Sequence, residues 1–371
     1  RRREHRTRRV LVIGNLRRVS LTLFVILLAL GFFASREDPE VTVYSDPSRF
    51  DGFTMGTTYS VQFAAKVPPD VAAALEKDTA QLLGKLDKEI FSTYVRSSEI
   101  SRLSQSSLDA PVQISTEMAE VLQEALKVAA ETDGAFDVTI APLVNLWGFG
   151  PQSNNADSAA PSQSSLREAL DRVDYRALVL DVSALTLART SDVEIDLSAI
   201  AKGYAVDRVA ELLEAYEIND FFVEVGGELR ISGHKDESKR GWVPAIEAPL
   251  SGLSQIYEIF LSRGDSIAVA GSGDYRNYFE VDGVRYSHEI DPRSGRPIEH
   301  TLAAVTVIDE SAMRADALAT AYMIMGVEAA KKTADAVGQA AYFIVRSGLG
   351  ASGEPRFEAQ HTEAFARYLV R

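Results

Sequence analysis

The chain has 371 residues, of which 46% are hydrophobic and 25% are charged, and its formal net charge is −14. This composition excludes a disordered chain, and the excess of carboxylates argues against nucleic-acid binding because it would repel phosphate backbones. Cysteine is absent, which excludes disulfides, thiolate metal sites, cysteine nucleophiles and a lipid-acceptor cysteine.

The N-terminus carries a basic segment followed by an uncharged one. Residues 1–18 hold eight arginines and one glutamate, a net charge of +7, which leaves −21 for the remainder. Residues 19–35 are uncharged and long enough for a short membrane anchor or a signal-peptide core. Because positive charge precedes them, we expect a cytoplasmic N-terminus and an extracytoplasmic remainder at a bacterial inner membrane, with a tether over 36–51. A protein secreted by a cleaved signal peptide and a buried core helix are the alternatives.

The segments after the tether have clear helix and strand patterns. Residues 53–66 predict a strand interrupted by Gly56. Apolar residues recur every three to four positions over 70–94 and 115–133, which predicts two amphipathic helices, the second capped by Ser115.

Strands dominate the second half of the chain. A loop rich in Ser, Asn, Ala and Pro is expected over 151–165, and further helices over 198–216 and from 311 to about 326. Asp282-Gly283, between two alternating segments, predicts a β-hairpin. The other predicted strands cover 177–181, 184–188, 221–225, 228–232, 242–248, 256–261, 266–271 and 302–308. Runs of helices and runs of strands, instead of strict alternation, indicate an α+β fold.

Two oxygen-bearing side chains stand four residues apart in the helix predicted from residue 311. Asp316 and Thr320 therefore share one face of that helix. A carboxylate and a hydroxyl are hard donors that suit Mg²⁺, which takes its remaining ligands from water and phosphate. The alternative is that Thr320 bonds back to the carbonyl of Asp316 while the carboxylate is solvated.

A second group of polar residues lies where a strand runs into the helix predicted over 198–216. Asp196 stands near the expected N-terminus of this helix, where free N–H groups bind anions. Lys202 stands in the first turn, where a positive charge is unfavourable beside the positive end of the helix dipole. A phosphate ligand would explain a lysine at this position. A capping aspartate and a surface lysine are the alternative. The paired Gly226 and Gly227 permit close backbone approach, without the spacing of a dinucleotide fingerprint or a P-loop.

One histidine is well placed for acid–base chemistry. His288 follows the predicted hairpin and is the best candidate for a general base among five histidines. The alternative is a structural histidine paired with Asp291. A zinc site is disfavoured because no histidines recur at ligand spacing, and a serine hydrolase because no G-x-S-x-G elbow occurs.

Eight short motifs, taken in order, resemble the FAD:protein FMN transferase family, also called ApbE-like. They are Met55-Gly56-Thr57, Ser92-Thr93-Tyr94, Gly134-Ala135-Phe136-Asp137, 196–205, Gly226-Gly227-Glu228, Ser272-Gly273-Asp274-Tyr275, 288–292 with Gly295, and 316–321. The resemblance implies an α+β fold with mixed or antiparallel sheets in two interleaved parts, a catalytic domain over 52–350 and a C-terminal extension over 351–371.

The resemblance also implies where cofactors bind. FAD would lie in a cleft between the two parts, in contact with Met55, Tyr94, Ala135, Phe136, Asp137, Asp196, Lys202, Gly226, Gly227 and Ile290. Mg²⁺ would be held by Asp316, Thr320 and the backbone carbonyl of Ala199. Ala319 stands where the family often has a further acidic ligand.

The implied reaction is Mg²⁺-dependent transfer of FMN from FAD to a threonine or serine of an acceptor protein, with release of AMP. The acceptor would be a subunit of a membrane redox complex. His288 is the expected base for the acceptor hydroxyl, with Asp274 or Asp291 as alternates. Hydrolysis of FAD to FMN and AMP, and an exported flavin-binding protein without catalysis, are the competing functions.

Overall fold

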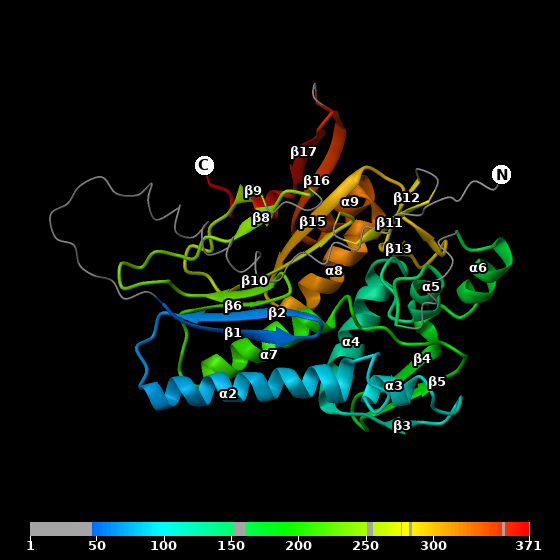
Figure 1. Cartoon of the computed structure of the whole chain (residues 1–371), viewed down its shortest axis with the longest axis horizontal. Coiled ribbons are helices and arrows are strands. Elements are labelled where there is room, and N and C mark those ends of the chain that lie inside the picture. Colours follow the sequence, from blue (N-terminus) through cyan, green and yellow to red (C-terminus); the bar gives the residue numbers. More distant parts are fainter. Residues whose placement is uncertain are drawn as a thin grey trace, which may run out of the picture.

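The computed structural model describes residues 47–151, 160–250, 255–275, 277–281, 284–350 and 353–370. They form an α+β fold, as expected, in which helices pack on one central sheet (Figure 1). Within these ranges no helix is long and apolar enough to cross a membrane. The expected anchor over 19–35 lies outside the described residues.

The central sheet is antiparallel throughout. Its strands follow the order β1-β2-β6-β7-β10-β15-β16-β17, so segments from both ends of the domain meet in one layer. The strands are β1 (Ser48–Thr54), β2 (Thr57–Phe63), β6 (Phe221–Val225), β7 (Glu228–Ser232), β10 (Ile267–Gly273), β15 (Leu302–Asp309), β16 (Ala340–Leu349) and β17 (Pro355–His361).

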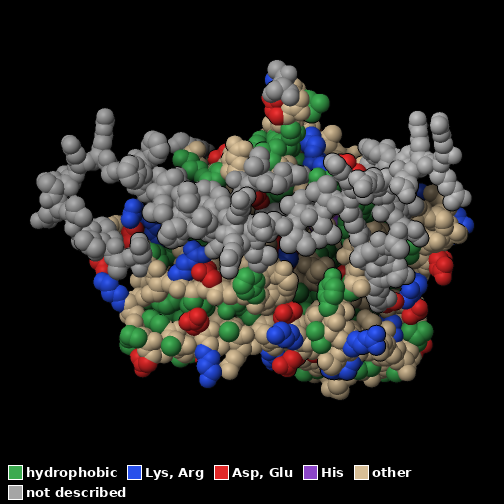
Figure 2. All heavy atoms as spheres, viewed as in Figure 1, with side chains coloured by type: hydrophobic (Ala, Val, Ile, Leu, Met, Phe, Trp, Pro, Cys, Tyr) green, Lys and Arg blue, Asp and Glu red, His purple; other side chains and the backbone are tan. Residues whose placement is uncertain are grey.

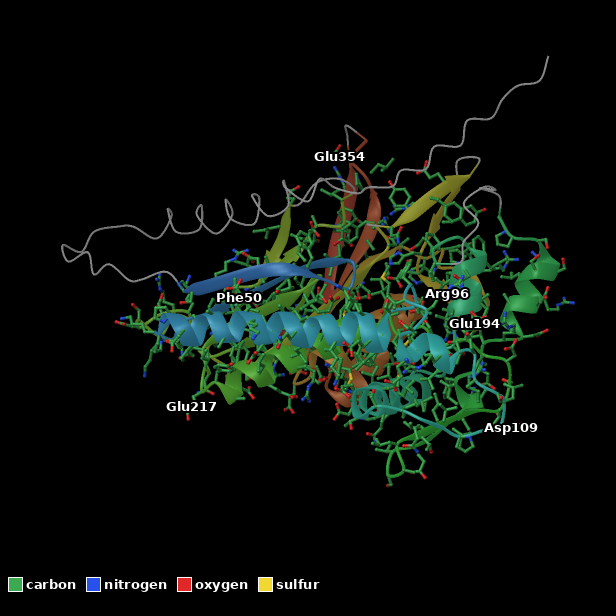
Figure 3. All side chains as sticks on the ribbon, turned by 60° about the horizontal axis from the view of Figure 1, so that its bottom comes forward. Phe50, Arg96, Asp109, Glu194, Glu217 and Glu354 are labelled. Atoms are coloured by element: carbon green, nitrogen blue, oxygen red, sulfur yellow. The ribbon has the colours of Figure 1, made fainter. Side chains whose placement is uncertain are left out.

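Four long helices pack around the sheet and on each other. Figure 3 shows α2 running along β1 and α7, and the α7–α8 and α4–α8 pairs are in contact. The helices are α2 (Pro69–Lys85), continued as the π-helical turn η1 (Leu86–Phe91), α4 (Thr116–Glu131), α7 (Ala201–Ala215) and α8 (Ala312–Met325). Their apolar faces and the inner face of the sheet form the largest core cluster.

Smaller elements surround this layer. A three-stranded sheet has the order β3-β5-β4, and three hairpins are β8-β9, β11-β12 and β13-β14. The strands are β3 (Val112–Gln113), β4 (Leu178–Asp181), β5 (Thr186–Arg189), β8 (Ala245–Glu247), β9 (Ile256–Ile259), β11 (Tyr278–Val281), β12 (Val284–Ser287), β13 (Ile290–Asp291) and β14 (Arg296–Pro297). The short helices are α3 (Glu99–Leu103), α5 (Ala141–Leu146), α6 (Gln163–Leu170), η2 (Tyr175–Ala177), α9 (Val327–Val337) and α10 (Glu363–Ala366).

The expected helices and strands are present, but several boundaries differ. For example, α6 begins at Gln163, inside the loop expected over 151–165. The strand predicted over 53–66 is the β1–β2 hairpin, because Met55 and Gly56 take positive φ values of 48° and 73° and reverse the chain. Strand β1 begins at Ser48, inside the expected tether. Helix α7 begins at Ala201 instead of residue 198, since the backbone forms a turn over the preceding residues.

The C-terminal residues form part of the sheet. Strand β17 pairs with β16 along the whole edge, and Phe365 and Tyr368 belong to the second core cluster. The segment expected as an extension therefore closes one side of the central sheet.

Candidate functional site

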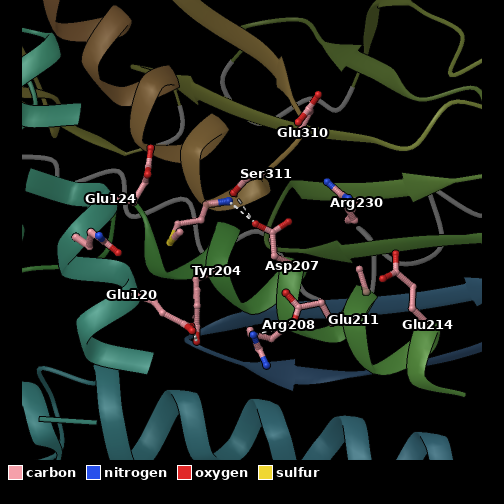
Figure 4. A pocket seen from close by; sticks show the side chains of 13 residues that line it. Glu120, Glu124, Tyr204, Asp207, Arg208, Glu211, Glu214, Arg230, Glu310 and Ser311 are labelled. Carbon is pink, nitrogen blue, oxygen red and sulfur yellow. Dashed lines mark hydrogen bonds and ion pairs between the residues drawn. The ribbon is translucent and has the colours of Figure 1, made fainter. Parts of the chain in front are cut away.

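The site is built at the junction of α7 and α8. Helix α8 begins after Ser311, whose hydroxyl accepts a hydrogen bond from Arg314 N. The carboxylate of Asp207, on α7, accepts bonds from Ser311 Oγ, Ala312 N and Met313 N at 2.8, 2.9 and 3.0 Å (Figure 4). Helix α7 therefore caps α8, which fixes the two helices in relation to each other.

Gly203 allows the closest approach of these helices. A Cβ at this position would lie 2.1 Å from the carbonyl oxygen of Ala312. At this contact the Gly203 N–H donates a 3.0 Å hydrogen bond to Oδ2 of Asp316. The sequence-predicted magnesium ligand of α8 is thus held by the backbone of α7, near its N-terminus.

Lys202 lies between two buried carboxylates. Its Nζ is 2.8 Å from Oε1 of Glu228 on β7 and 3.6 Å from Oδ1 of Asp316. Burial alone would lower the pKa of Lys202, but the charges of Asp316 and Glu228 outweigh it and raise that pKa. Burial raises the pKa of Asp316 and, against the opposing effect of Lys202, raises that of Glu228 to about 7. One lysine therefore neutralises two buried carboxyl groups incompletely.

The remaining metal-ligand candidates lie close to this cluster in the chain and the fold. Thr320 Oγ1 is 3.1 Å from Ser272 Oγ on β10, so its hydroxyl points toward the central sheet. Ala199 lies in the turn that precedes α7. Within the described ranges no three His, Cys, Asp or Glu side chains gather as a metal site. The available donors are carboxylate, hydroxyl and carbonyl oxygens, which fit Mg²⁺ and leave room for water or phosphate ligands.

The histidine and the two candidate aspartates have different environments. His288 Nδ1 lies 3.0 Å from the carbonyl oxygen of Asn277, and its Nε2 lies 3.7 Å from Oε1 of Glu289. Asp291 instead accepts bonds from the backbone and guanidinium of Arg293, so the alternative of a His288–Asp291 pair is wrong.

Asp274 is buried and paired with an arginine. Arg346, on β16, donates to its Oδ2 at 2.8 Å, and Arg285 donates to its backbone carbonyl at 2.6 Å. Both oxygens of this carboxylate accept hydrogen bonds from Arg346, so neither is free to face an acceptor hydroxyl. This arrangement favours His288 over Asp274 as the base.

The residues expected to contact FAD come from several loops. Tyr94 is 75% exposed, and Met55 occupies the β1–β2 turn. Ala135 and Phe136 are buried, and Ile290 is buried on β13. The contacts of these residues with the flavin therefore stay predictions.

Two of the expected FAD-binding aspartates organise the backbone. Asp137 accepts bonds from Thr139 N, Thr139 Oγ1 and Tyr175 N at 2.7, 2.6 and 3.0 Å. Asp196 accepts from Ser198 N at 2.8 Å, in the turn that leads into α7. Both carboxylates thus shape loops beside the site, and any bond to FAD would be additional.

An open pocket of about 370 Å³ lies on the other side of α7 (Figure 4). Its walls include Tyr204, Asp207, Arg208, Glu211 and Glu214, which lie on the helix face opposite Lys202. None of the residues predicted from the sequence lines it, and its walls carry more acidic than basic side chains. We therefore place the chemistry at the Lys202 cluster and not in this pocket.

Several polar residues at the site have no role assigned to them from the sequence. They are Glu228 and Glu289, which carry buried carboxylates, and Ser272 and Arg346, which bond predicted residues. The signal that could have found Glu228 is an acidic residue directly after paired glycines, at the first position of a strand.

Comparison with known proteins identifies the family of the chain. The model of the ApbE family matches residues 55–344. The FAD:protein FMN transferase of Haemophilus influenzae is 37% identical over 88% of this chain and 93% of that protein, and that of Vibrio cholerae is 38% identical over 88% and 94%.

Solved structures give the same result. The apo form of flavinyl transferase ApbE from Pseudomonas stutzeri aligns with a TM-score of 0.77 and 37% identity over 89% of this chain and 99% of that one. The flavin transferase ApbE from Vibrio cholerae aligns with a TM-score of 0.76 and 35% identity over 88% and 100%. The chain therefore belongs to the ApbE family.

Proposed function

We infer that this chain is an FAD:protein FMN transferase that moves the FMN half of FAD onto a threonine or serine hydroxyl of an acceptor protein. Its relatives carry that name, and the family match covers most of the described domain. The observation that carries the chemistry is the buried cluster in which Lys202 lies between Glu228 and Asp316. A half-buried cation and two buried carboxylates beside a helix N-terminus suit the binding of a pyrophosphate together with a metal ion.

The reaction exchanges one phosphorus–oxygen bond for another. The acceptor oxygen bonds to the phosphorus of the FMN half, and the bond from that phosphorus to the AMP half breaks. FMN stays on the acceptor as a phosphoester, AMP leaves, and the hydroxyl proton passes to a base. Lys202 is the side chain that we assign to the pyrophosphate, where its charge favours the transition state.

His288 is the base that we propose. A carbonyl oxygen only accepts hydrogen bonds, so the contact with Asn277 requires the proton on Nδ1. Neutral His288 then has its lone pair on Nε2, available for the proton of the acceptor hydroxyl. The arginine partners of Asp274 and Asp291 make these two residues the weaker candidates.

We propose Asp316, Thr320 and the backbone carbonyl of Ala199 as the residues that hold Mg²⁺. When bound there, the ion would neutralise phosphate oxygens and stabilise the leaving AMP. Removal of Mg²⁺ by a chelator is expected to stop AMP formation.

The location and the partner are part of the same proposal. The basic segment over 1–18 and the uncharged segment over 19–35 support an anchored protein that works on the outer face of a bacterial inner membrane. An acceptor subunit of a membrane redox complex would be reachable from there. On the lower part of one face, Figure 2 shows basic and acidic side chains interspersed, which is consistent with a protein partner and not with nucleic acid.

The test follows the two products over time. The purified protein is incubated with FAD and Mg²⁺, with and without a candidate acceptor, and AMP and protein-bound flavin are measured. Equal amounts of AMP and bound flavin, formed only with the acceptor, are expected. AMP without bound flavin would identify an FAD hydrolase, and FAD binding without AMP would identify a flavin-binding protein.

A further inference from the structure

Glu228 occupies a position that the β6–β7 turn fixes tightly. Gly226 and Gly227 have φ values of 62° and 109°, and Val225 pairs with Glu228 directly across them. A Cβ on Gly226 would lie 2.8 Å from Cγ2 of Thr57 and 3.2 Å from Cδ of Lys202. The glycine pair therefore lets this hairpin close against the Lys202 side chain, with Glu228 beside it.

The carboxylate of Glu228 is only half satisfied. The residue is 2% exposed, and its Oε1 receives the Lys202 ammonium at 2.8 Å. Its Oε2 is also buried, and among the described residues it has no hydrogen-bond partner. A buried carboxylate oxygen without a partner is destabilising, because it loses its water without gaining a hydrogen bond, and a ligand at this atom would remove that cost.

The charges around Oε2 favour a cation as that ligand. Lys202 supplies one positive charge, which Glu228 and Asp316 share. Helix α8 presents only one carboxylate here, because the position three residues after Asp316 is the buried Ala319. The two carboxylates and Lys202 together carry one negative charge, so a divalent cation beside them would reverse it and leave one positive charge to attract a phosphate. Carboxylate oxygens are the ligands that Mg²⁺ prefers.

We propose that Glu228 supplies its Oε2 to the same divalent cation that Asp316 holds. Strand β7 and helix α8 would then contribute one carboxylate each, one from either side of Lys202. The inference rests on the metal site of the proposed function and adds to it a side chain from a second element. It also gives the Gly226–Gly227 turn a purpose, since this turn sets the position of Glu228.

Binding of Mn²⁺ alone, without FAD or acceptor, tests this proposal. Free Mn²⁺ is measured by electron paramagnetic resonance during titration of the wild-type protein and of Glu228→Gln, Asp316→Asn and Glu99→Gln. Glu99 is a matched control, since its carboxylate is also buried but accepts a bond from Ser115 N, away from the cluster. We expect both Glu228→Gln and Asp316→Asn to weaken Mn²⁺ binding on the order of tenfold or more. Glu99→Gln should bind as the wild type does.

The outcomes separate this inference from the proposed function. If Asp316→Asn weakens Mn²⁺ binding and Glu228→Gln does not, Glu228 is no ligand and serves only Lys202 or FAD, while the metal site stands. If neither variant weakens binding, the metal site of the proposed function fails as well. If Glu228→Gln does not fold, Glu228→Asp is measured in its place, because it keeps the charge while its side chain is one methylene shorter. It must then weaken Mn²⁺ binding, and unchanged binding would overturn the proposal.

Discussion

We expect Gly203→Ala to disturb the junction of α7 and α8, where the site is built. The added Cβ would lie 2.1 Å from the carbonyl oxygen of Ala312 and 2.8 Å from Cα of Met313, and neither backbone atom can rotate away. To reach the ordinary contact distance of 3.4 Å, α7 and α8 must separate by 1.3 Å. The same movement stretches the bond from Gly203 N to Asp316, which is 3.0 Å long.

The expected magnitudes follow from two opposing effects. Overpacking costs about 1–3 kcal/mol, and a backbone obstacle places this site at the upper end. Alanine has a better helix propensity than glycine, which offsets about 1 kcal/mol of this cost. We therefore expect the free energy of unfolding to fall by about 2 kcal/mol. Because Lys202 and Asp316 lie on the two helices that separate, the rate of FMN transfer should fall on the order of a hundredfold.

Urea unfolding and the transfer rate at saturating FAD measure the two effects. Gly84→Ala is the matched control, because Gly84 also lies in a helix but its Cβ would meet nothing within 4 Å. The control should be as stable as the wild type or more stable, with an unchanged rate. A Gly203→Ala protein with wild-type stability and wild-type rate would refute the reasoning.

Three further predictions concern an ion pair, the arginine that pairs with a buried aspartate, and an exposed ring. Burial raises the pKa of Glu117, but Lys85 outweighs this effect and holds that pKa below its ordinary value of 4.5. The stability that this pair contributes is therefore present above pH 4.5 and is lost as the pH falls below it. Glu117→Gln should lower the free energy of unfolding by about 0.5 kcal/mol at pH 7, and in urea titrations the difference should shrink as the pH falls below 4.5. Arg346→Met should cost up to about 3 kcal/mol, because it leaves the buried Asp274 carboxylate with only the more distant Arg285, 3.9 Å from its Oδ1. Asp274→Asn in the same protein should recover part of this loss, and a purely additive double-mutant cycle would contradict the pairing. Tyr94→Ala should weaken FAD binding in a fluorescence titration and leave the unfolding midpoint unchanged, since Tyr94 is 75% exposed; unchanged FAD affinity would remove it from the flavin pocket.

Local patterns were sufficient to predict the helices that carry the site. Ser115 caps α4 as predicted, and α8 begins directly after Ser311, where the predicted helix starts, because a cap depends on residues within one turn. Asp316 and Thr320 share one side of α8 for the same reason. The start of α7 was predicted too early, since Asp196 binds Ser198 N and holds the chain in a turn.

The contacts that complete the site could not be predicted from local patterns. Glu228 meets Lys202 only because β6 and β7 lie beside β2 and β10 in the central sheet, an order that the sequence does not encode locally. Arg346 and Asp274 are separated by 72 positions and meet because β16 and β10 flank β15. Burial of Glu289 beside His288 likewise depends on the packing of the whole domain.

The most direct test of the central claim is the mass of an acceptor protein after reaction. A candidate acceptor with a single threonine at its modification site is incubated with this protein, FAD and Mg²⁺, and analysed intact and as peptides. We predict an added mass of one FMN phosphoester on that threonine, its absence in a threonine-to-alanine acceptor, and its loss with Asp316→Asn. An unmodified acceptor alongside accumulated AMP would contradict transfer and leave hydrolysis as the activity of this fold.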